Sequence, residues 1–127
     1  MRLNQVTVGC RDIDASVAFY KRLGLRQIVA DKHYARFELP DGGSTFSLHV
    51  LDGAPDPGQT CVYFECDDLD AVVARLKGEG FAFESGPVDQ PWLWREAWLR
   101  DPYGNRVCLY FAGANRLDPP WRLREST

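Results

Sequence analysis

The chain has 127 residues, of which 45% are hydrophobic, and it carries a formal net charge of −3 at pH 7. A chain of this size can bury a core of its own, and without a basic stripe a nucleic-acid partner is not expected. No run approaches the roughly 18 apolar residues of a membrane-spanning helix, and the first residues contain no apolar signal segment. We therefore expect a cytoplasmic protein with no membrane partner.

An internal repeat with an offset of 56 residues organises the sequence. Nine of the nineteen positions between residues 6 and 24 recur 56 residues later. In the first copy these positions are Val6, Cys10, Asp12, Asp14, Ala15, Val17, Ala18, Lys21 and Gly24. Two copies are too few for a solenoid, which needs more repeats to bury its core. The repeat therefore predicts two copies of one supersecondary unit within a single domain.

The first copy begins with a predicted strand and a predicted helix. Residues 5–10 alternate in polarity, which is typical of a strand with one buried face. Asp12 or Asp14 can cap the helix that follows, and Gly24 suits its C-terminal turn. Two later stretches, 36–39 and 45–50, read as strands joined by a tight turn that is rich in glycine.

The second copy repeats this order. Residues 61–66 alternate, Asp68 or Asp70 can cap the next helix, and Gly80 suits its end. Strands are predicted over 97–100 and 106–111, joined by the turn 101–105, whose sequence is Asp-Pro-Tyr-Gly-Asn. Each copy is therefore predicted to be a βαβββ unit. We expect module one to span 1–51, a linker 52–59, module two 60–112, and a tail 113–127 that lies across the body or a partner subunit.

Several short motifs together resemble the vicinal oxygen chelate superfamily. They are Gln5-Val6-Thr7-Val8 followed by Asp12, then Phe19-Tyr20, Leu23-Gly24-Leu25 and the 101–105 turn. This superfamily includes glyoxalase I, extradiol dioxygenases and the bleomycin and fosfomycin resistance proteins. The resemblance extends from about Leu3 to Phe111. It implies an α+β fold in which two pseudo-symmetric βαβββ modules form a curled mixed β-sheet cup with helices on the outer face. It also implies a small-molecule ligand and a homodimer.

The resemblance further implies four positions for metal ligands. In the family a metal is held by residues at the start of each unit's first strand and on its last strand. In this chain these positions fall on Gln5, Cys61 and Cys108, and on Ser47 or His49, which share one face of their strand. A divalent metal (zinc, nickel, manganese or iron) on Gln5, His49, Cys61 and Cys108 is one interpretation, and two thiolates with an imidazole suit zinc. The alternative is no metal, with both cysteines lining the cup as small hydrophobic residues.

Two carboxylates are candidates for proton transfer. Glyoxalase-type isomerisation requires a group that moves a proton between adjacent carbons. Glu65 shares a strand face with Tyr63 and could act as this base, and Glu96 is a second candidate. Glu96 and its neighbour Arg95 point to opposite faces of a strand, so one of them is expected to enter the cup. Arg95 there could hold an anionic group.

A segment rich in tryptophan follows in the second copy. The segment 91–98 contains three tryptophans, more apolar surface than a small sheet needs. The residues predicted to bind substrate are Tyr63, Trp92, Trp94, Arg95 and Tyr110. The alternative for this segment is a dimer contact rich in tryptophan with a structural ion pair.

Two functions of different classes follow from these features. One is a small-molecule-binding, glyoxalase-like protein that acts as a metal-dependent lyase or isomerase on a substrate with vicinal oxygens. The other is a metal-free protein of the bleomycin-resistance type that sequesters an aromatic or charged small molecule.

Overall fold

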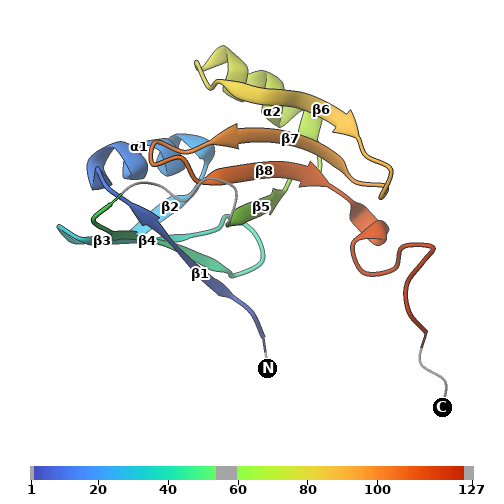
Figure 1. Cartoon of the computed structure of the whole chain (residues 1–127), viewed down its shortest axis with the longest axis horizontal. Coiled ribbons are helices and arrows are strands. Elements are labelled where there is room, and N and C mark those ends of the chain that lie inside the picture. The colour runs from blue at the N-terminus through green and yellow to red at the C-terminus, as the bar shows by residue number, and fades with distance from the viewer. Residues whose placement is uncertain (1, 54–59, 125–127) are drawn as a thin grey trace. The chain divides into compact units, whose positions relative to one another are not determined.

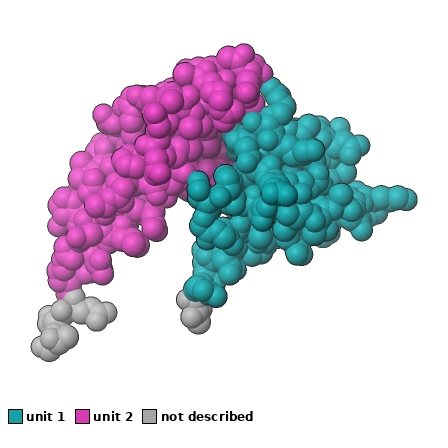
Figure 2. All heavy atoms as spheres, turned by 180° about the vertical axis from the view of Figure 1, so that it is seen from behind, with its two compact units in different colours: residues 1–60, 100–106 teal, residues 61–99, 107–127 magenta. Residues whose placement is uncertain are grey.

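A computed structural model describes residues 2–53 and 60–124 of the chain. Its contacts divide the chain into two compact units, which Figure 2 shows in different colours. Unit 1 contains residues 1–60 and 100–106, and unit 2 contains residues 61–99 and 107–127. Most of the predicted linker, residues 54–59, lies outside the described residues.

Unit 1 consists of one helix and a four-stranded sheet (Figure 1). Its elements are β1 (Gln5–Cys10), α1 (Ile13–Leu23), β2 (Arg26–Ala30), β3 (Tyr34–Glu38) and β4 (Thr45–Val50). The strand order is β1-β4-β3-β2. Strand β1 pairs with β4 in parallel, whereas β3 is antiparallel to both of its neighbours, so the sheet is mixed.

Unit 2 has the same order of elements along the chain and in its sheet. Its elements are β5 (Cys61–Glu65), α2 (Leu69–Gly78), β6 (Phe83–Asp89), β7 (Arg95–Arg100), β8 (Arg106–Phe111) and a short 3-10 helix, η1 (Gly113–Asn115). The strand order is β5-β8-β7-β6. The prediction of two βαβββ units is therefore confirmed.

The sequence patterns did not predict the positions of β2 and β6, the strands that directly follow the two helices. Pairing between β6 and β7 shifts register twice, between Phe83 and Ser85 and between Ser85 and Val88. Gly86 and Pro87 lie at the second shift, and these residue types weaken an alternating strand pattern. Irregular strands of this kind produce little signal in the sequence.

Each helix starts at the first of its two candidate capping aspartates. Asp12 accepts a hydrogen bond from the backbone N–H of Ala15 at 3.1 Å, and Asp68 accepts one from Ala71 at 3.4 Å. The second aspartate of each pair lies in the first helical turn, where the positive end of the helix dipole stabilises its negative charge. Gly24 ends α1 with a φ of 123°, a conformation that favours glycine.

The core of unit 1 lies between α1 and the sheet. Tyr20 contacts Phe46 and Phe37 there, with ring centroids 4.5 and 6.1 Å apart, and all three side chains are buried. In unit 2 the apolar face of α2 is buried in the same way, through Leu69, Val73 and Leu76. In both units the sheet face away from the helix is thus left for other roles.

The turn between β7 and β8 belongs to unit 1, although the repeat assigns it to the second copy. The side-chain amide of Asn105 donates to the backbone oxygen of Gly9 at 2.8 Å. A side chain at Gly9 would meet Leu51 at 2.5 Å and Tyr103 at 3.6 Å, so this approach is close. The turn is therefore held by β1 as well as by its own hydrogen bonds.

The described part of the tail exposes its large apolar side chains. Leu117, Trp121 and Leu123 are 65%, 56% and 92% exposed. Trp121 is therefore not buried as an anchor among the described residues, and packing of the tail on a partner subunit stays a prediction. No helix in the described parts of the chain is long and apolar enough to cross a membrane.

Candidate functional site

A polar network covers the face of the unit 1 sheet opposite α1. Alternation along β3 buries Ala35 and Phe37 on the helix side and leaves Tyr34 and Arg36 on the other side. Ser47, in the neighbouring strand β4, is also on this second face and is completely buried. These residues form a continuous chain of hydrogen bonds.

The network starts at Gln5 and ends at Arg36. The Gln5 side-chain amide donates to Ser47 Oγ at 2.8 Å, and Ser47 Oγ is 2.6 Å from the Tyr34 hydroxyl. Arg36 Nε donates to the same Tyr34 oxygen at 2.9 Å. The hydrogen bond with Ser47 and the one from Arg36 lower the pKa of Tyr34. The Gln5 carbonyl oxygen, in turn, accepts from the Thr45 hydroxyl.

His49 lies on the same face and is opposite Tyr34 in the pairing of β3 with β4, but it is far from Gln5. In the parallel pairing Gln5 is opposite Thr45, whereas His49 is opposite Gly9, four residues further along β1. At the rise of a strand this is roughly 13 Å along the sheet. The Gln5 amide therefore reaches Ser47, the first of the two alternatives for this position, while the His49 side chain is exposed.

Four aromatic rings cover the face of the unit 2 sheet opposite α2, and we call them the aromatic cluster: Tyr63, Trp94, Trp98 and Tyr110. Trp94 stacks on Tyr110 with ring centroids 4.6 Å apart. Tyr63 meets the other three rings edge to face at 5.5 to 5.9 Å. Tyr110 is buried, but Tyr63 is 44% exposed, so part of the cluster faces outwards.

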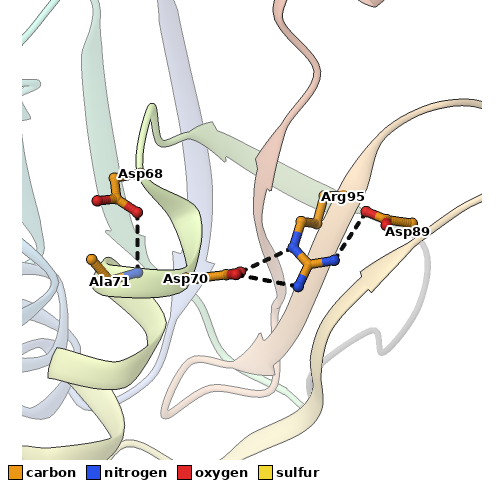
Figure 3. Close-up of polar contacts among 5 residues, drawn as sticks. All are labelled: Asp68, Asp70, Ala71, Asp89 and Arg95. Carbon is orange, nitrogen blue, oxygen red and sulfur yellow. Dashed lines mark hydrogen bonds and ion pairs between the residues drawn. The ribbon is translucent and has the colours of Figure 1, made fainter.

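Glu96, rather than Arg95, lies on the face with the aromatic cluster. Glu96 is 3% exposed, and its carboxylate accepts hydrogen bonds from the indole N–H groups of Trp92 and Trp98, at 2.7 and 3.0 Å. Arg95 points to the α2 side, where Asp70 and Asp89 hold its guanidinium at 2.9 and 3.0 Å (Figure 3). The open choice between the two residues is thereby decided, and Arg95 is not placed to hold a ligand on the aromatic face.

Glu65 is engaged at the end of its strand. One carboxylate oxygen accepts from the backbone N–H groups of Ala112 and Gly113, at 2.9 and 3.0 Å. The other oxygen is 3.8 Å from Arg116. Glu65 thus caps the short helix η1. Burial, together with the negative charge of Glu65, raises the pKa of nearby Tyr110.

The four cysteines lie in different surroundings. Cys10 is completely buried, and burial raises the pKa of both Cys10 and Cys66. Cys108 is also completely buried and packs with Tyr110, Ala112, Trp94 and Trp98. Cys61 is half-buried at the start of β5. Cys108 therefore forms part of the layer beneath the aromatic cluster.

The donors within each unit do not fit a metal ion. Of the predicted ligands, Gln5 and His49 belong to unit 1, and Cys61 and Cys108 belong to unit 2. Both ends of the Gln5 amide are already hydrogen-bonded to neighbouring hydroxyl groups. In the described ranges no three His, Cys, Asp or Glu side chains are grouped so that they could hold a metal. The metal set stays a prediction, and no chemical step is derived from it.

Sequence reasoning missed Tyr34 and Arg36 on the unit 1 face. It included Trp98 in the segment 91–98 but not among the residues predicted to bind substrate. The signal that could have identified Tyr34 and Arg36 is the alternation of residues 34–38, in which every second residue is apolar and buried. A strand that starts at Tyr34 instead of Arg36 places both polar side chains on the face with Ser47.

Residues 2–109 match the family model of the Glyoxalase/Bleomycin resistance protein/Dioxygenase superfamily. A relative named "Probable trivalent organoarsenical cleaving enzyme", from Bacillus subtilis (strain 168), is 27% identical over 122 residues, which cover 91% of this chain and 83% of the relative.

Solved structures share the fold. A glyoxalase/bleomycin resistance protein/dioxygenase from Nocardioides has a TM-score of 0.79 at 24% identity and covers 98% of this chain and 90% of its own. A bleomycin-binding protein complexed with bleomycin has a TM-score of 0.72 at 24% identity, covering 87% of this chain and 98% of its own. Lactoylglutathione lyase from Agrobacterium tumefaciens has a TM-score of 0.72 at 22% identity, covering 87% and 92%.

Proposed function

The chain belongs to the glyoxalase/bleomycin resistance/dioxygenase superfamily, as the resemblance predicted, and on that premise we propose that it binds an aromatic small molecule on the aromatic cluster of unit 2. The observation that carries the proposal is the cluster itself. Four rings contact one another on the sheet face away from α2, and one of them, Tyr63, is 44% exposed. A flat ligand can stack on such a surface, where a favourable ring pair contributes about 0.5–1.5 kcal/mol beyond the buried area.

The aromatic cluster lies on the sheet face opposite the helix-side core of unit 2 and extends the layer over Cys108, which supports a role in binding. The helix side of the sheet is already filled by Leu69, Val73 and Leu76 together with strand residues such as Leu99. Tryptophan and tyrosine on the other face add rigid apolar surface with few rotatable bonds. These are the properties of an anchoring surface for a ligand.

Charge in this region favours a neutral or cationic aromatic ligand over an anionic one. The Glu96 carboxylate lies within the layer and accepts hydrogen bonds from two indole N–H groups. Aromatic faces attract cations and repel anions. Among the structures of shared fold, one is described as a bleomycin-binding protein complexed with bleomycin, which makes bleomycin a suitable first probe.

Calorimetric titration of the whole chain tests this proposal. The probes are bleomycin and two matched naphthalenes, one with an ammonium group and one with a carboxylate. Truncation of a central aromatic anchor commonly weakens binding about tenfold or more, so we expect this from Tyr63→Ala. The control is Phe111→Ala, which removes a similarly exposed ring (40%) next to Arg95 and Asp70, on the other face of the sheet.

Two results would contradict the proposal: equal binding by the Tyr63→Ala and wild-type proteins, or no saturable heat with any probe. Stronger binding of the naphthalene carboxylate than of the ammonium compound, lost in Tyr63→Ala, would overturn the assignment of ligand charge.

The second candidate is a metal-dependent lyase or isomerase that acts on a substrate with vicinal oxygens. It is supported by the name of the Bacillus subtilis relative, which denotes a cleaving enzyme, and by Gln5 at a family metal position. Against it, Glu65 caps η1 and Glu96 accepts hydrogen bonds from two indoles, so both predicted bases are already engaged in hydrogen bonds.

Elemental analysis of the purified chain and of a Gln5→Ala, His49→Ala variant tests this second candidate. Near-stoichiometric metal that is lost in the variant would favour this enzyme, whereas metal-free protein after incubation with each ion would exclude it.

The proposal includes a homodimer located in the cytoplasm. The exposed side chains of Trp121 and Leu123 in the tail provide apolar surface that a second copy could bury. Light scattering of the wild-type chain and of a Trp121→Ser variant tests this, because a tail-mediated dimer should dissociate more readily in the variant.

A further inference from the structure

We propose that unit 1 contains a second binding site, in which Arg36 and the hydroxyl pair Tyr34–Ser47 hold an oxyanion of a small molecule, a carboxylate or phosphate group. The site lies on the sheet face opposite α1, over β3 and β4. It is separate in its residues from the aromatic cluster, so it goes beyond the function proposed above.

Arg36 has donors that the described residues do not use. Its Nε donates to the Tyr34 hydroxyl at 2.9 Å, and its guanidinium lies 5.4 Å from the centre of the Tyr34 ring. Both contacts fix the orientation of the guanidinium plane. No carboxylate in the described parts of the chain pairs with Arg36, and its two terminal nitrogens make no hydrogen bond there. An oriented guanidinium with a free edge matches the two oxygens of a carboxylate or phosphate.

The hydroxyl pair also has one proton more than it can use. Tyr34 and Ser47 share one hydrogen bond of 2.6 Å, which can contain only one of their two hydroxyl protons. The other contacts of this pair are donated to it, by Gln5 Nε2 to Ser47 and by Arg36 Nε to Tyr34. One O–H group is therefore left without an acceptor among the described residues. A ligand oxygen at this point would satisfy it.

The charges nearby agree with an anionic ligand. On the same face of β3, the carboxylate closest in sequence is Glu38, and it pairs with Arg26 of β2 at 3.5 Å. Among the described residues, Arg36 thus has no carboxylate partner beside the network, where His49 is the residue opposite Tyr34. Gln5 acts as a positioning residue that holds Ser47. A surface rich in donors and poor in acceptors binds anionic oxygens more strongly than neutral ligands.

The test is an NMR titration of the full ¹⁵N-labelled chain with sodium acetate and, separately, with potassium phosphate, at an ionic strength held constant with chloride. The Arg36 Nε–H signal reports on the site, and the Arg26 Nε–H signal is the internal control. We expect a saturable shift at Arg36 with at least one of the two anions. The anion that binds more tightly identifies the planar or the tetrahedral group as the natural one.

Four variants complete the test. Arg36→Gln should weaken binding about tenfold or more, and Tyr34→Phe by a smaller factor, since charged hydrogen bonds contribute more than neutral ones. Arg26→Gln is the matched control, an exposed arginine of the same sheet whose charge is already paired, and it should leave the affinity unchanged. Equal shifts at Arg26 and Arg36, a shift that does not saturate, or unchanged affinity in Arg36→Gln would overturn the proposal. Tyr63→Ala should not affect this titration, which separates the proposal from the aromatic site.

Discussion

The hydroxyl of Tyr20, on α1, donates a buried hydrogen bond of 2.7 Å to Oδ2 of Asp101, which lies 81 residues further along the chain. The other oxygen of Asp101 accepts from the backbone N–H groups of Tyr103, Gly104 and Asn105, at 2.9 to 3.0 Å. One buried carboxylate therefore shapes the turn between β7 and β8 and joins it to the core of unit 1.

Tyr20→Phe should lower the free energy of unfolding by about 2 kcal/mol, because a buried hydrogen bond to a charged group is lost. The loss is limited by the Asn105 side-chain amide, which still donates to the same Asp101 oxygen at 2.8 Å. Urea denaturation measures the change. Tyr110→Phe is a suitable control, since Tyr110 is buried but its hydroxyl makes no hydrogen bond to the described residues. Equal losses in both variants would show that the Tyr20 contact contributes nothing specific.

Alkaline pH should destabilise the chain in part through Tyr20. Burial, and then the charge and hydrogen bond of Asp101, raise the pKa of Tyr20 far above its ordinary value of about 10. The neutral phenol therefore persists in the folded chain, while the unfolded chain releases this proton above about pH 10. The stability from this group is complete below that pH and falls by up to about 1.4 kcal/mol per pH unit above it. Urea denaturation across this range should show a steeper decline for wild type than for Tyr20→Phe, and parallel curves would contradict the assignment.

Glu96→Ala should lower the free energy of unfolding by about 1–3 kcal/mol. The substitution removes the acceptor of two indole N–H groups, and the Trp98 side chain is only partly accessible to water. Glu96→Gln should lose less, because its amide oxygen can still accept one of the two bonds. Denaturation followed by tryptophan fluorescence reports on this region directly, since all four tryptophans are in unit 2. Glu79→Gln, at an exposed pair with Arg75, should change the stability by less than about 0.5 kcal/mol.

Ser16→Ala should leave the stability unchanged or raise it by up to about 1 kcal/mol. The Ser16 hydroxyl is buried in α1 and has no hydrogen-bond partner among the described residues. Alanine removes this unsatisfied group and is also the better helix former. A loss of more than about 1 kcal/mol in thermal or urea unfolding would mean that the hydroxyl has a partner, such as an ordered water molecule.

The sequence by itself determined the repeated architecture. Nine shared positions at one offset predicted two equal units, and the alternation of 5–10 and 61–66 predicted the first strand of each. These signals are local, because strand period, helix caps and tight turns depend on residues that are close in sequence. For the same reason the sequence placed Glu96 and Arg95 on opposite faces of a strand without deciding which of them faces α2.

Only the tertiary structure decided which side chains meet on each face. Arg36 and Ser47 are opposite each other because of the register between β3 and β4, and Gln5 joins them through the parallel pairing of β1 with β4. The contact of Tyr20 with Asp101 likewise joins segments far apart in the chain. Register and long-range packing are set by the burial of whole faces against one another, and the spacing of residues along a single strand does not contain this information.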